Sequence, residues 1–465
     1  MNPRLAAAVA AGRSAGFVTR ALGRGGGTAL PGLVAERLDP RVVAHLGQQL
    51  GRGRVLITGT NGKTTTARIL ARMLTEAGQP FVHNREGSNL MRGLASTLVA
   101  IAGPTGAIPR AQRTLGLFEV DEATLPAAAR ALAPRALAFT NLFRDQLDRY
   151  GEVDTVAGFW REALANSPRD ATLVLNADDP SVADLELAWD GPIHWFGLDD
   201  PAFATDFAGA FDARWCGRCG GSFAYDRRYF AHIGYWRCTG CGRARPQPAT
   251  SGSAIRLGLD SASFAAAGLG ELTMPLTGAY NVYNALAAIA LGRVLGLPDD
   301  ALRAGVANVR AAFGRQEVTE LEGRKLRLLL AKNPAGANQV LRLLAAVAAD
   351  QGNKLRVALL LNDRFADGHD VSWIWDTDYE LLDGLVGTAW AAGDRAEDMA
   401  LRLKYAGWPE PAAVVREPAA LLDAVLRDTA PGDQVFVVPT YTAMLDLRQE
   451  LQRRGAVGEF WRSEA

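Results

Sequence analysis

Lysine is scarce in this sequence. Only five of its 50 basic residues are lysines, at positions 63, 325, 332, 354 and 404, so arginine serves wherever a plain positive charge suffices. A lysine differs from an arginine because it carries a compact point charge on a flexible stem. Lys63 is the only lysine in the first 324 residues, which indicates a specific role for it.

A net charge and a long apolar run are also missing. The 50 basic residues balance 50 acidic ones, so no overall field favours nucleic acid or an anionic membrane, although a local basic patch stays open. No apolar run reaches the roughly 20 residues that a membrane-spanning helix needs. The Ala- and Arg-rich residues 1–30 are either a short targeting peptide or an amphipathic helix with a glycine loop, and we favour the helix. We therefore expect a cytoplasmic protein.

The length of 465 residues predicts two or three domains. Strand and helix signals alternate, which indicates an α/β fold with a parallel sheet and helices on both of its faces. We expect a helical segment at 1–50, a central domain at 51–312 and a smaller α/β domain at 313–465. The pattern breaks at 212–250, which we interpret as an inserted module, and it returns near Glu271. The expected strands are 54–58, 115–120, 136–141, 171–176, 355–361, 387–392 and 433–439, and the expected helices are 63–76, 123–133, 155–166, 279–296, 339–350 and 394–406.

Residues 59–66 read GTNGKTTT and follow a short buried strand. The glycines allow backbone N–H groups to turn toward phosphate oxygens, and a helix that begins at Lys63 directs its positive end at them. The alternative is a glycine turn with a surface lysine, but the flanking strand and helix and the scarcity of lysine argue against it. We expect Lys63 to reach the β and γ phosphates and the Thr64 hydroxyl to bind Mg²⁺. The residues expected to bind the nucleotide are Gly59, Thr60, Asn61, Gly62, Lys63, Thr64 and Thr65.

Acidic and amide side chains follow the next strands. Glu119 ends a buried strand, and a carboxylate at that edge of the sheet is a candidate Mg²⁺ ligand. Asp121 and Glu122 either share this role or cap the next helix. Asn141, Asp145, Gln146 and Asp148 follow another strand and NADDP (176–180) follows a third, so these residues are caps, turn formers or contacts to metal or substrate.

The four cysteines form one C-x₂-C-x₁₈-C-x₂-C pattern. This spacing is typical of a tetrahedral zinc site, and four thiolates would leave no open position for catalysis. Gly220 and Gly242 each follow a cysteine pair and allow the turn that directs N–H groups at the thiolates. Two disulfides are the alternative, which a reducing compartment disfavours. The expected zinc ligands are Cys216, Cys219, Cys238 and Cys241.

Five motifs in order resemble the Mur ligase and folylpolyglutamate synthase superfamily. They are GTNGKTTT (59–66), FEVDE (118–122), NLFRDQLDRYGE (141–152), GAYNVYNALAA (278–288) and FGRQE (313–317). The resemblance implies a central ATP-binding domain in which Asn281 contacts the adenine and Arg315 lies at the nucleotide site near the domain junction.

Three departures from the superfamily pattern are visible. Its Asp-His pair is here Asp145-Gln146, so a histidine metal ligand is missing, and the His before the first Asn of its GxHN pattern is Tyr280. The carbamylated lysine of many relatives also has no counterpart. Glu162 is the candidate replacement for that lysine.

The four-cysteine insertion, LAKNPAGANQV (330–340) and LNDRFADGHDVSWIWD (361–376) are similar to one branch of this superfamily. That branch lacks the usual N-terminal nucleotide-sugar domain and pairs with a class I glutaminase. The resemblance implies ATP-dependent amidation of the D-glutamate α-carboxylate in the stem peptide of lipid II, through an acyl phosphate, at the inner face of the membrane. It also implies that an acid of 361–376 orients the glutaminase histidine, for which Asp370 is our choice and Asp367 the reserve.

Two other functions compete with this prediction. One is a self-sufficient ligase that adds an amino acid to a carboxylate, and the other is a degenerate ligase domain that only holds a partner. The intact phosphate loop and Glu119 argue against the second.

Overall fold

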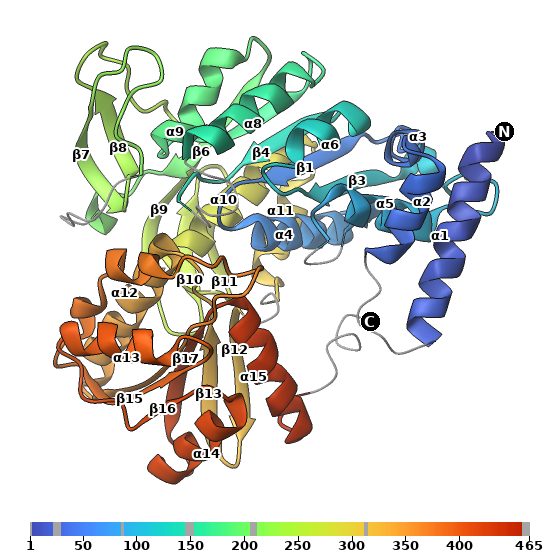
Figure 1. Ribbon diagram of the computed structural model, residues 1–465. Helices are drawn as coiled ribbons and strands as arrows, with labels where there is room; N and C mark the ends of the chain where they lie inside the picture. Colours follow the sequence, from blue (N-terminus) through green and yellow to red (C-terminus); the bar gives the residue numbers. More distant parts are fainter. Residues whose placement is uncertain are drawn as a thin grey trace.

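A computed structural model of the chain describes residues 2–21, 29–84, 88–144, 153–204, 212–310 and 315–457 (Figure 1). Its larger sheet has nine strands, and all pairs from β2 to β9 are parallel, whereas β10 and β11 extend one edge in antiparallel fashion. In spatial order the strands are β11 (Gly270–Met274), β10 (Ala262–Ala266), β9 (Thr250–Leu257), β6 (Ile193–Leu198), β5 (Thr172–Asn176), β4 (Ala136–Phe139), β1 (Arg54–Thr58), β3 (Leu115–Glu119) and β2 (Phe81–His83).

Helices bury both faces of this sheet. Along β1, Val55 and Ile57 belong to one apolar core and Leu56 to the other, because successive side chains of a strand point to opposite faces. This double burial explains why the central strands are continuous apolar runs. The first core contains α4 (Lys63–Glu76), α10 (Ala279–Val294) and α11 (Asp299–Ala307), and the second contains α1 (Pro3–Ala21), α2 (Leu30–Leu38), α3 (Val42–Gly47), α5 (Met91–Ile101), α6 (Leu125–Leu132), α8 (Val153–Ala165) and the short α9 (Pro180–Ala183).

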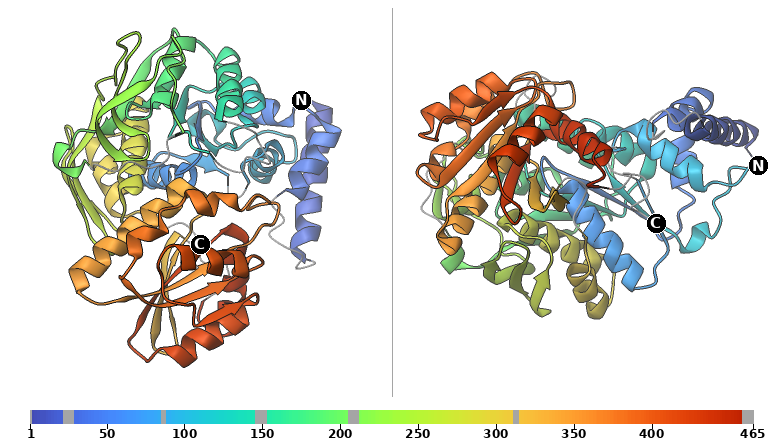
Figure 2. Two further views of the ribbon diagram at one scale, coloured as in Figure 1. Left: turned by 60° about the vertical axis from the view of Figure 1, so that its left-hand side comes forward. Right: turned by 90° about the horizontal axis from the view of Figure 1, so that it is seen from below.

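A second, six-stranded sheet forms the C-terminal part of the molecule (Figure 2). Only β12 is antiparallel to its neighbour. In spatial order its strands are β12 (Arg315–Leu321), β13 (Arg324–Leu329), β17 (Gln434–Pro439), β14 (Leu355–Leu360), β15 (Val386–Ala392) and β16 (Ala413–Val415). The helices α12 (Pro334–Gln351) and α13 (Ala396–Tyr405) pack in one core, and α14 (Pro418–Asp428) and α15 (Tyr441–Arg453) pack in the other.

The inserted segment folds as an antiparallel hairpin of β7 (Phe223–Phe230) and β8 (Ile233–Cys238), which stands beside the larger sheet (Figure 1). Short 3₁₀ helices complete the described elements: η1 (Ala111–Arg113), η2 (Asp184–Ala188), η3 (Pro201–Phe203), η4 (Ser372–Asp376) and η5 (Tyr379–Leu382).

The α/β class and every expected strand and helix are present, but two expected boundaries are wrong. The helix expected at 339–350 begins at Pro334, because the Asn333 side chain accepts a hydrogen bond from Gly336 N and caps it. The sheet pattern returns at Thr250 rather than near Glu271.

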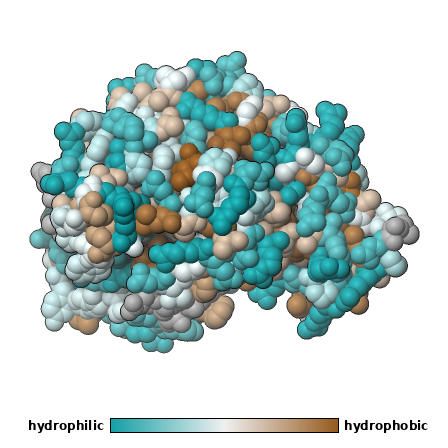
Figure 3. All heavy atoms as spheres, turned by 90° about the horizontal axis from the view of Figure 1, so that it is seen from above, coloured by the Kyte–Doolittle hydropathy of each residue, from teal (hydrophilic) through white to brown (hydrophobic). Residues whose placement is uncertain are grey.

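The surface is mainly hydrophilic on the face in Figure 3, where hydrophobic areas are small and separate. None of the described helices combines the length and apolarity needed to cross a lipid bilayer. The glycine stretch expected to follow the first helix lies mostly in 22–28, outside the described residues.

Candidate active site at the carboxyl edge of the larger sheet

The loop between β1 and α4 has a backbone that only glycine fits at two positions. Gly59 and Gly62 have φ values of 131° and 89°. A Cβ atom at Gly59 would lie 2.1 Å from the Thr140 hydroxyl oxygen, and one at Gly62 would lie 2.0 Å from Asn284 Oδ1. No side chain caps the first turn of α4, so its N–H groups point into the loop as an anion site requires.

The segment after β4 holds this loop in place. Thr60 N donates to Asn141 O at 3.0 Å, and Asn61 N donates to Asn141 Oδ1 at 2.9 Å. Phe143 N donates to the Thr60 hydroxyl at 2.9 Å. Three hydrogen bonds thus tie the phosphate loop to the segment after β4.

Lys63 forms an ion pair with Glu122, whose Oε1 lies 2.7 Å from Lys63 Nζ. Lys63 Nζ also donates to Gly59 O. Burial alone would lower the pKa of Lys63, but the carboxylates of Glu122, Glu119 and Asp121 raise it above its usual value. Lys63 is therefore charged at any physiological pH.

Glu122 is the residue that sequence reasoning placed least well. It does not cap a helix; its carboxylate neutralises Lys63, whereas Asp121 does form a turn by accepting from Ala123 N. Glu119 is buried at the end of β3, where its backbone is held by the side chain of Asn84. A carboxylate partner for Lys63 could have been predicted from the sequence, because a largely buried lysine needs one.

The other residues expected to bind nucleotide or metal lie in several parts of the chain, and some lie outside its described part. Thr64 and Thr65 are buried in the first turn of α4, and Asn281 is buried on α10, beside Asn284, which touches Gly62. Arg315 begins β12, but its side chain lies outside the described part of the chain. Asp145, Gln146 and Asp148 lie outside the described residues.

Glu162 is wrong as a replacement for the carbamylated lysine. It lies near the end of α8, is mostly exposed and forms an ion pair with Arg130 of α6 at 3.4 Å. The last turn of α6 ends beside Arg54 at the start of β1, so this pair lies at the amino edge of the sheet, opposite the phosphate loop.

The four cysteines meet as a zinc site requires. Their sulfurs all lie within 4.8 Å of one another, with 3.4 Å between Cys219 and Cys238, and none forms a disulfide. Four sulfurs about 2.3 Å from a tetrahedral zinc ion are about 3.8 Å apart, so the set fits. The N–H group of Cys241 lowers the pKa of Cys238 to about 6. The N–H group of Gly221 lowers the pKa of Cys219, but hydrogen bonds to the other cysteines outweigh it and raise that pKa to about 11. Gly220 and Gly242 have φ values of 70° and 72°, the left-handed turns expected there.

The two candidate acids of the 361–376 segment differ in setting. Asp367 is buried and accepts hydrogen bonds from the N–H and hydroxyl groups of Thr442 at the start of α15; burial raises its pKa. Asp370 is exposed, and hydrogen bonds from Ser372 lower its pKa. Asp370 is therefore an ionised carboxylate open to a partner, whereas Asp367 is used within the fold.

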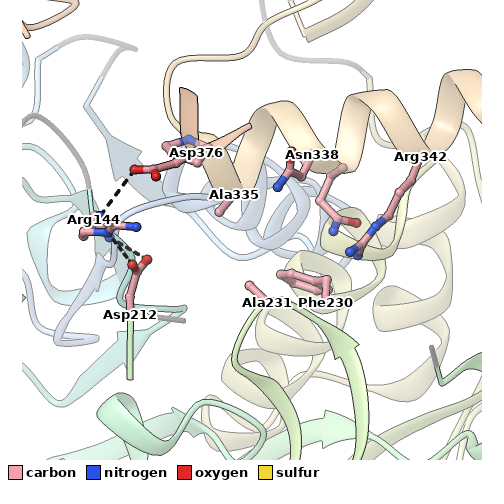
Figure 4. A pocket seen from close by; sticks show the side chains of 10 residues that line it. Arg144, Asp212, Phe230, Ala231, Ala335, Asn338, Arg342 and Asp376 are labelled. Carbon is pink, nitrogen blue, oxygen red and sulfur yellow. Dashed lines mark hydrogen bonds and ion pairs between the residues drawn. The ribbon is translucent and has the colours of Figure 1, made fainter. Parts of the chain in front are cut away.

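A pocket lies between the hairpin turn, the segment after β4 and one face of α12 (Figure 4). Arg144 forms ion pairs with Asp212 and, at 3.4 Å, with Asp376 at one end. Asn333, which caps α12, donates to Asn61 Oδ1 at 3.2 Å, so the pocket adjoins the phosphate loop. Its lining residues are Arg144, Asp212, Phe230, Ala231, Pro334, Ala335, Asn338, Gln339, Arg342 and Asp376.

Comparisons with known proteins agree with this architecture. The family described as Mur ligase middle domain matches residues 57–213, and that described as MurT ligase C-terminal matches residues 330–444. A Streptococcus pneumoniae (strain R6) protein named lipid II isoglutaminyl synthase (glutamine-hydrolyzing) subunit MurT is 33% identical, across 98% of this chain and 99% of its own.

Solved structures share the fold. A pseudomurein peptide ligase type C from Methanothermus fervidus has a TM-score of 0.64 at 20% identity, covering 87% of this chain and 79% of its own. MurF ligase from Thermotoga maritima, solved in complex with ADP, has a TM-score of 0.60 at 14% identity, covering 89% and 83%. The expected Mur ligase-type fold is thereby confirmed.

Replacing Lys63 with Ala should lower both the nucleotide affinity and the free energy of unfolding, for different reasons. Nucleotide affinity should fall about 10- to 100-fold, since charge-assisted hydrogen bonds contribute about 1.5–3 kcal/mol. The free energy of unfolding should fall by about 3–5 kcal/mol, because Glu122 is left buried without its partner. Calorimetric titration with an ATP analogue and denaturant melts measure the two effects.

The matched control is Lys63→Ala combined with Glu122→Gln, which should restore most of the stability and none of the affinity. In Lys63→Ala alone, the unpaired Glu122 has a folded pKa above its unfolded one, so stability should be kept at acidic pH and lost as pH rises through the folded value. Unchanged nucleotide affinity in Lys63→Ala would rule out the phosphate-loop interpretation.

Freshly purified protein should contain one zinc per chain by elemental analysis. Cys238→Ser should lower both the zinc content and the melting temperature, because ligand loss removes metal-linked folding energy. Absence of zinc, or peptide mapping that finds Cys–Cys bridges, would contradict the zinc assignment.

Proposed function

The chain belongs to the MurT family of Mur ligases, and from that premise we propose that it amidates the D-glutamate α-carboxylate of lipid II, giving D-isoglutamine. The observation that carries the proposal is the phosphate loop with its largely buried Lys63, in a chain related over nearly its whole length to a protein named for this synthesis. We place the activity in the cytoplasm, at the inner face of the membrane where lipid II resides.

The reaction needs activation because a carboxylate carbon is a poor electrophile. A carboxylate oxygen attacks the γ phosphorus of ATP and ADP leaves, which gives an acyl phosphate. The nitrogen lone pair of ammonia then attacks the acyl carbon, phosphate leaves and one proton is lost. Lys63, the loop N–H groups and the start of α4 stabilise the charge on the transferring phosphoryl group. Thr64 and Glu119 would hold Mg²⁺, which neutralises phosphate charge when bound.

We assign the ATP site to the central domain, residues 51–312, which carries the zinc ribbon at 212–250 and follows a helical segment at 1–50. Asn281 would contact the adenine, and Arg315 would approach the nucleotide from the domain junction. The pocket of Figure 4 adjoins the phosphate loop, so this side of the site is where the acceptor carboxylate would approach the nucleotide.

Ammonia would come from a GatD-like class I glutaminase bound to the C-terminal domain, residues 313–465. Exposed aromatic side chains near Asp370 support this surface: Phe365 is 73% exposed, Trp375 50% and Tyr405 69%. Interfaces are enriched in aromatic residues, and monomers seldom leave several exposed together. Asp370 would fix the orientation of the glutaminase histidine, as the acid of a catalytic triad does.

Reconstitution with the purified glutaminase tests the function. With ATP, lipid II and glutamine, the pair should form amidated lipid II, and hydroxylamine should trap the acyl phosphate. Addition of an amino acid by this chain alone would instead identify a self-sufficient ligase. Partner binding without any ATP-dependent product would identify a scaffold.

Asp370→Asn should abolish glutamine hydrolysis by the assembled pair while complex formation survives. Amidation supplied with free ammonium should persist at least in part, since the ligase site is intact. Asp363→Asn is the matched control on the same segment, because Asp363 pairs with Arg395 at 3.1 Å and is partly exposed.

Asp367→Asn completes the set. Normal hydrolysis in Asp370→Asn with loss in Asp367→Asn would move the role to Asp367 and keep the mechanism. Normal glutamine hydrolysis in both variants would contradict the proposal that this chain supplies the acid of the glutaminase triad.

A further inference from the structure

Asp178 and Asp179 follow β5 and are fully buried, and neither is a free ligand for metal or substrate. The Asp178 carboxylate accepts hydrogen bonds from Leu198 N, Arg245 and the Tyr283 hydroxyl. Asp179 caps α9 by accepting from Ser181 N and Val182 N. A buried carboxylate is costly unless it is paired, so these contacts must be made together. Both residues join the cysteine module to the nucleotide site.

The first connection runs through Asp178 to α10. Arg245, four residues after Cys241, forms a buried ion pair with Asp178. The Tyr283 hydroxyl donates to the other oxygen of Asp178 at 2.6 Å. Tyr283 is the neighbour of Asn284, whose side chain lies against Gly62 of the phosphate loop.

The second connection runs through Asp179 to the segment after β4. His232, in the hairpin turn, is fully buried with its Nε2 3.4 Å from Asp179 Oδ1. The other oxygen of Asp179 accepts from Leu142 N at 2.8 Å. The next residue, Phe143, packs on His232 with ring centroids 4.6 Å apart and bonds to Thr60.

The cysteine turns are fastened to the same part of the fold. Gly217, between Cys216 and Cys219, donates to Asp184 at 2.9 Å, and Arg243 forms an ion pair with the same carboxylate. A metal bound by the four sulfurs would therefore fix Arg243 and Arg245 relative to η2 and β5. Without that metal, the hairpin would be held mainly by contacts near its turn.

We propose that zinc in the four-cysteine module and nucleotide in the phosphate loop bind with positive coupling, the module acting as the positioning element for α10 and for the segment after β4. This inference rests on the ATP site of the proposed function and extends it to the module. Coupling between two sites is reciprocal, so zinc must tighten nucleotide binding by the same factor by which nucleotide tightens zinc binding. Tyr283 is the positioning residue that we single out.

Two titrations of the full chain test the coupling. A non-hydrolysable ATP analogue with Mg²⁺ should bind zinc-loaded protein about tenfold more tightly than zinc-depleted protein, within the range usual for coupled sites. Zinc affinity, from competition with a chromogenic chelator, should rise by the same factor when the analogue is present. Equal nucleotide affinity with and without zinc in folded protein overturns the inference.

If zinc-depleted protein does not fold, the variant Tyr283→Phe tests the coupling in zinc-loaded protein. It removes only the hydroxyl that reaches Asp178, keeps the ring packed on Phe230, and should weaken nucleotide binding about fivefold to tenfold, at the lower end of the range usual for coupled sites. Tyr229→Phe is the matched control, since Tyr229 is also a buried tyrosine and its hydroxyl accepts from Asp200 N instead of donating to Asp178.

A merely structural role predicts similar losses of melting temperature in both variants and unchanged nucleotide affinity. That result overturns the inference. No nucleotide binding by wild-type protein at all would instead defeat the proposed function, so the two failures are distinguishable.

Discussion

A buried ammonium group must be neutralised, and the arrangement of this site follows from that requirement at Lys63. In the structure Glu122 supplies the counter-charge, with Glu119 and Asp121 nearby. Three carboxyl groups surround one lysine, although burial raises the pKa of Glu122 against the effect of Lys63. Such an acidic site favours a polyphosphate that arrives with a divalent cation over a polyphosphate alone. The glycine backbone and the open start of α4 then provide the donors for phosphate oxygens. The same carboxylates thus hold Lys63 in place and set the charge that a ligand would meet.

Parallel topology brings the other parts to Lys63. The carboxyl ends of β1, β3, β4 and β5 lie side by side, so the segments that follow them meet at one edge of the sheet. That is why a strand followed by polar residues predicted the site from sequence. The phosphate loop and Glu119 were predicted this way, and the four-cysteine cluster was predicted from the spacing of its two C-x₂-C pairs, because each signal depends on residues close together in the sequence.

What sequence could not give depends on contacts between distant residues. The role of Glu122 required knowing which of three neighbouring carboxylates points at Lys63. The NADDP aspartates look like ligands in sequence, yet burial and three-way hydrogen bonding make Asp178 a structural junction. Likewise, the early start of α12 follows from Asn333, which caps the helix and bonds to Asn61 from 272 residues away.

The C-terminal unit meets the phosphate loop and the segment after β4 through two kinds of contact, and their strengths differ. Arg144 and Asp376 are 35% and 46% exposed, and an ion pair of that kind contributes about 0–1 kcal/mol. Asn333 is only 2% exposed, and a buried amide that loses its partner costs about 1–3 kcal/mol. The Asn333–Asn61 hydrogen bond therefore dominates, and the first turn of α12 should follow the phosphate loop when the loop adjusts to a ligand. On the same helix, Asn338 accepts a hydrogen bond from Asp378 N, two residues beyond the 361–376 segment that carries Asp370, so α12 contacts both the phosphate loop and the chain next to that segment.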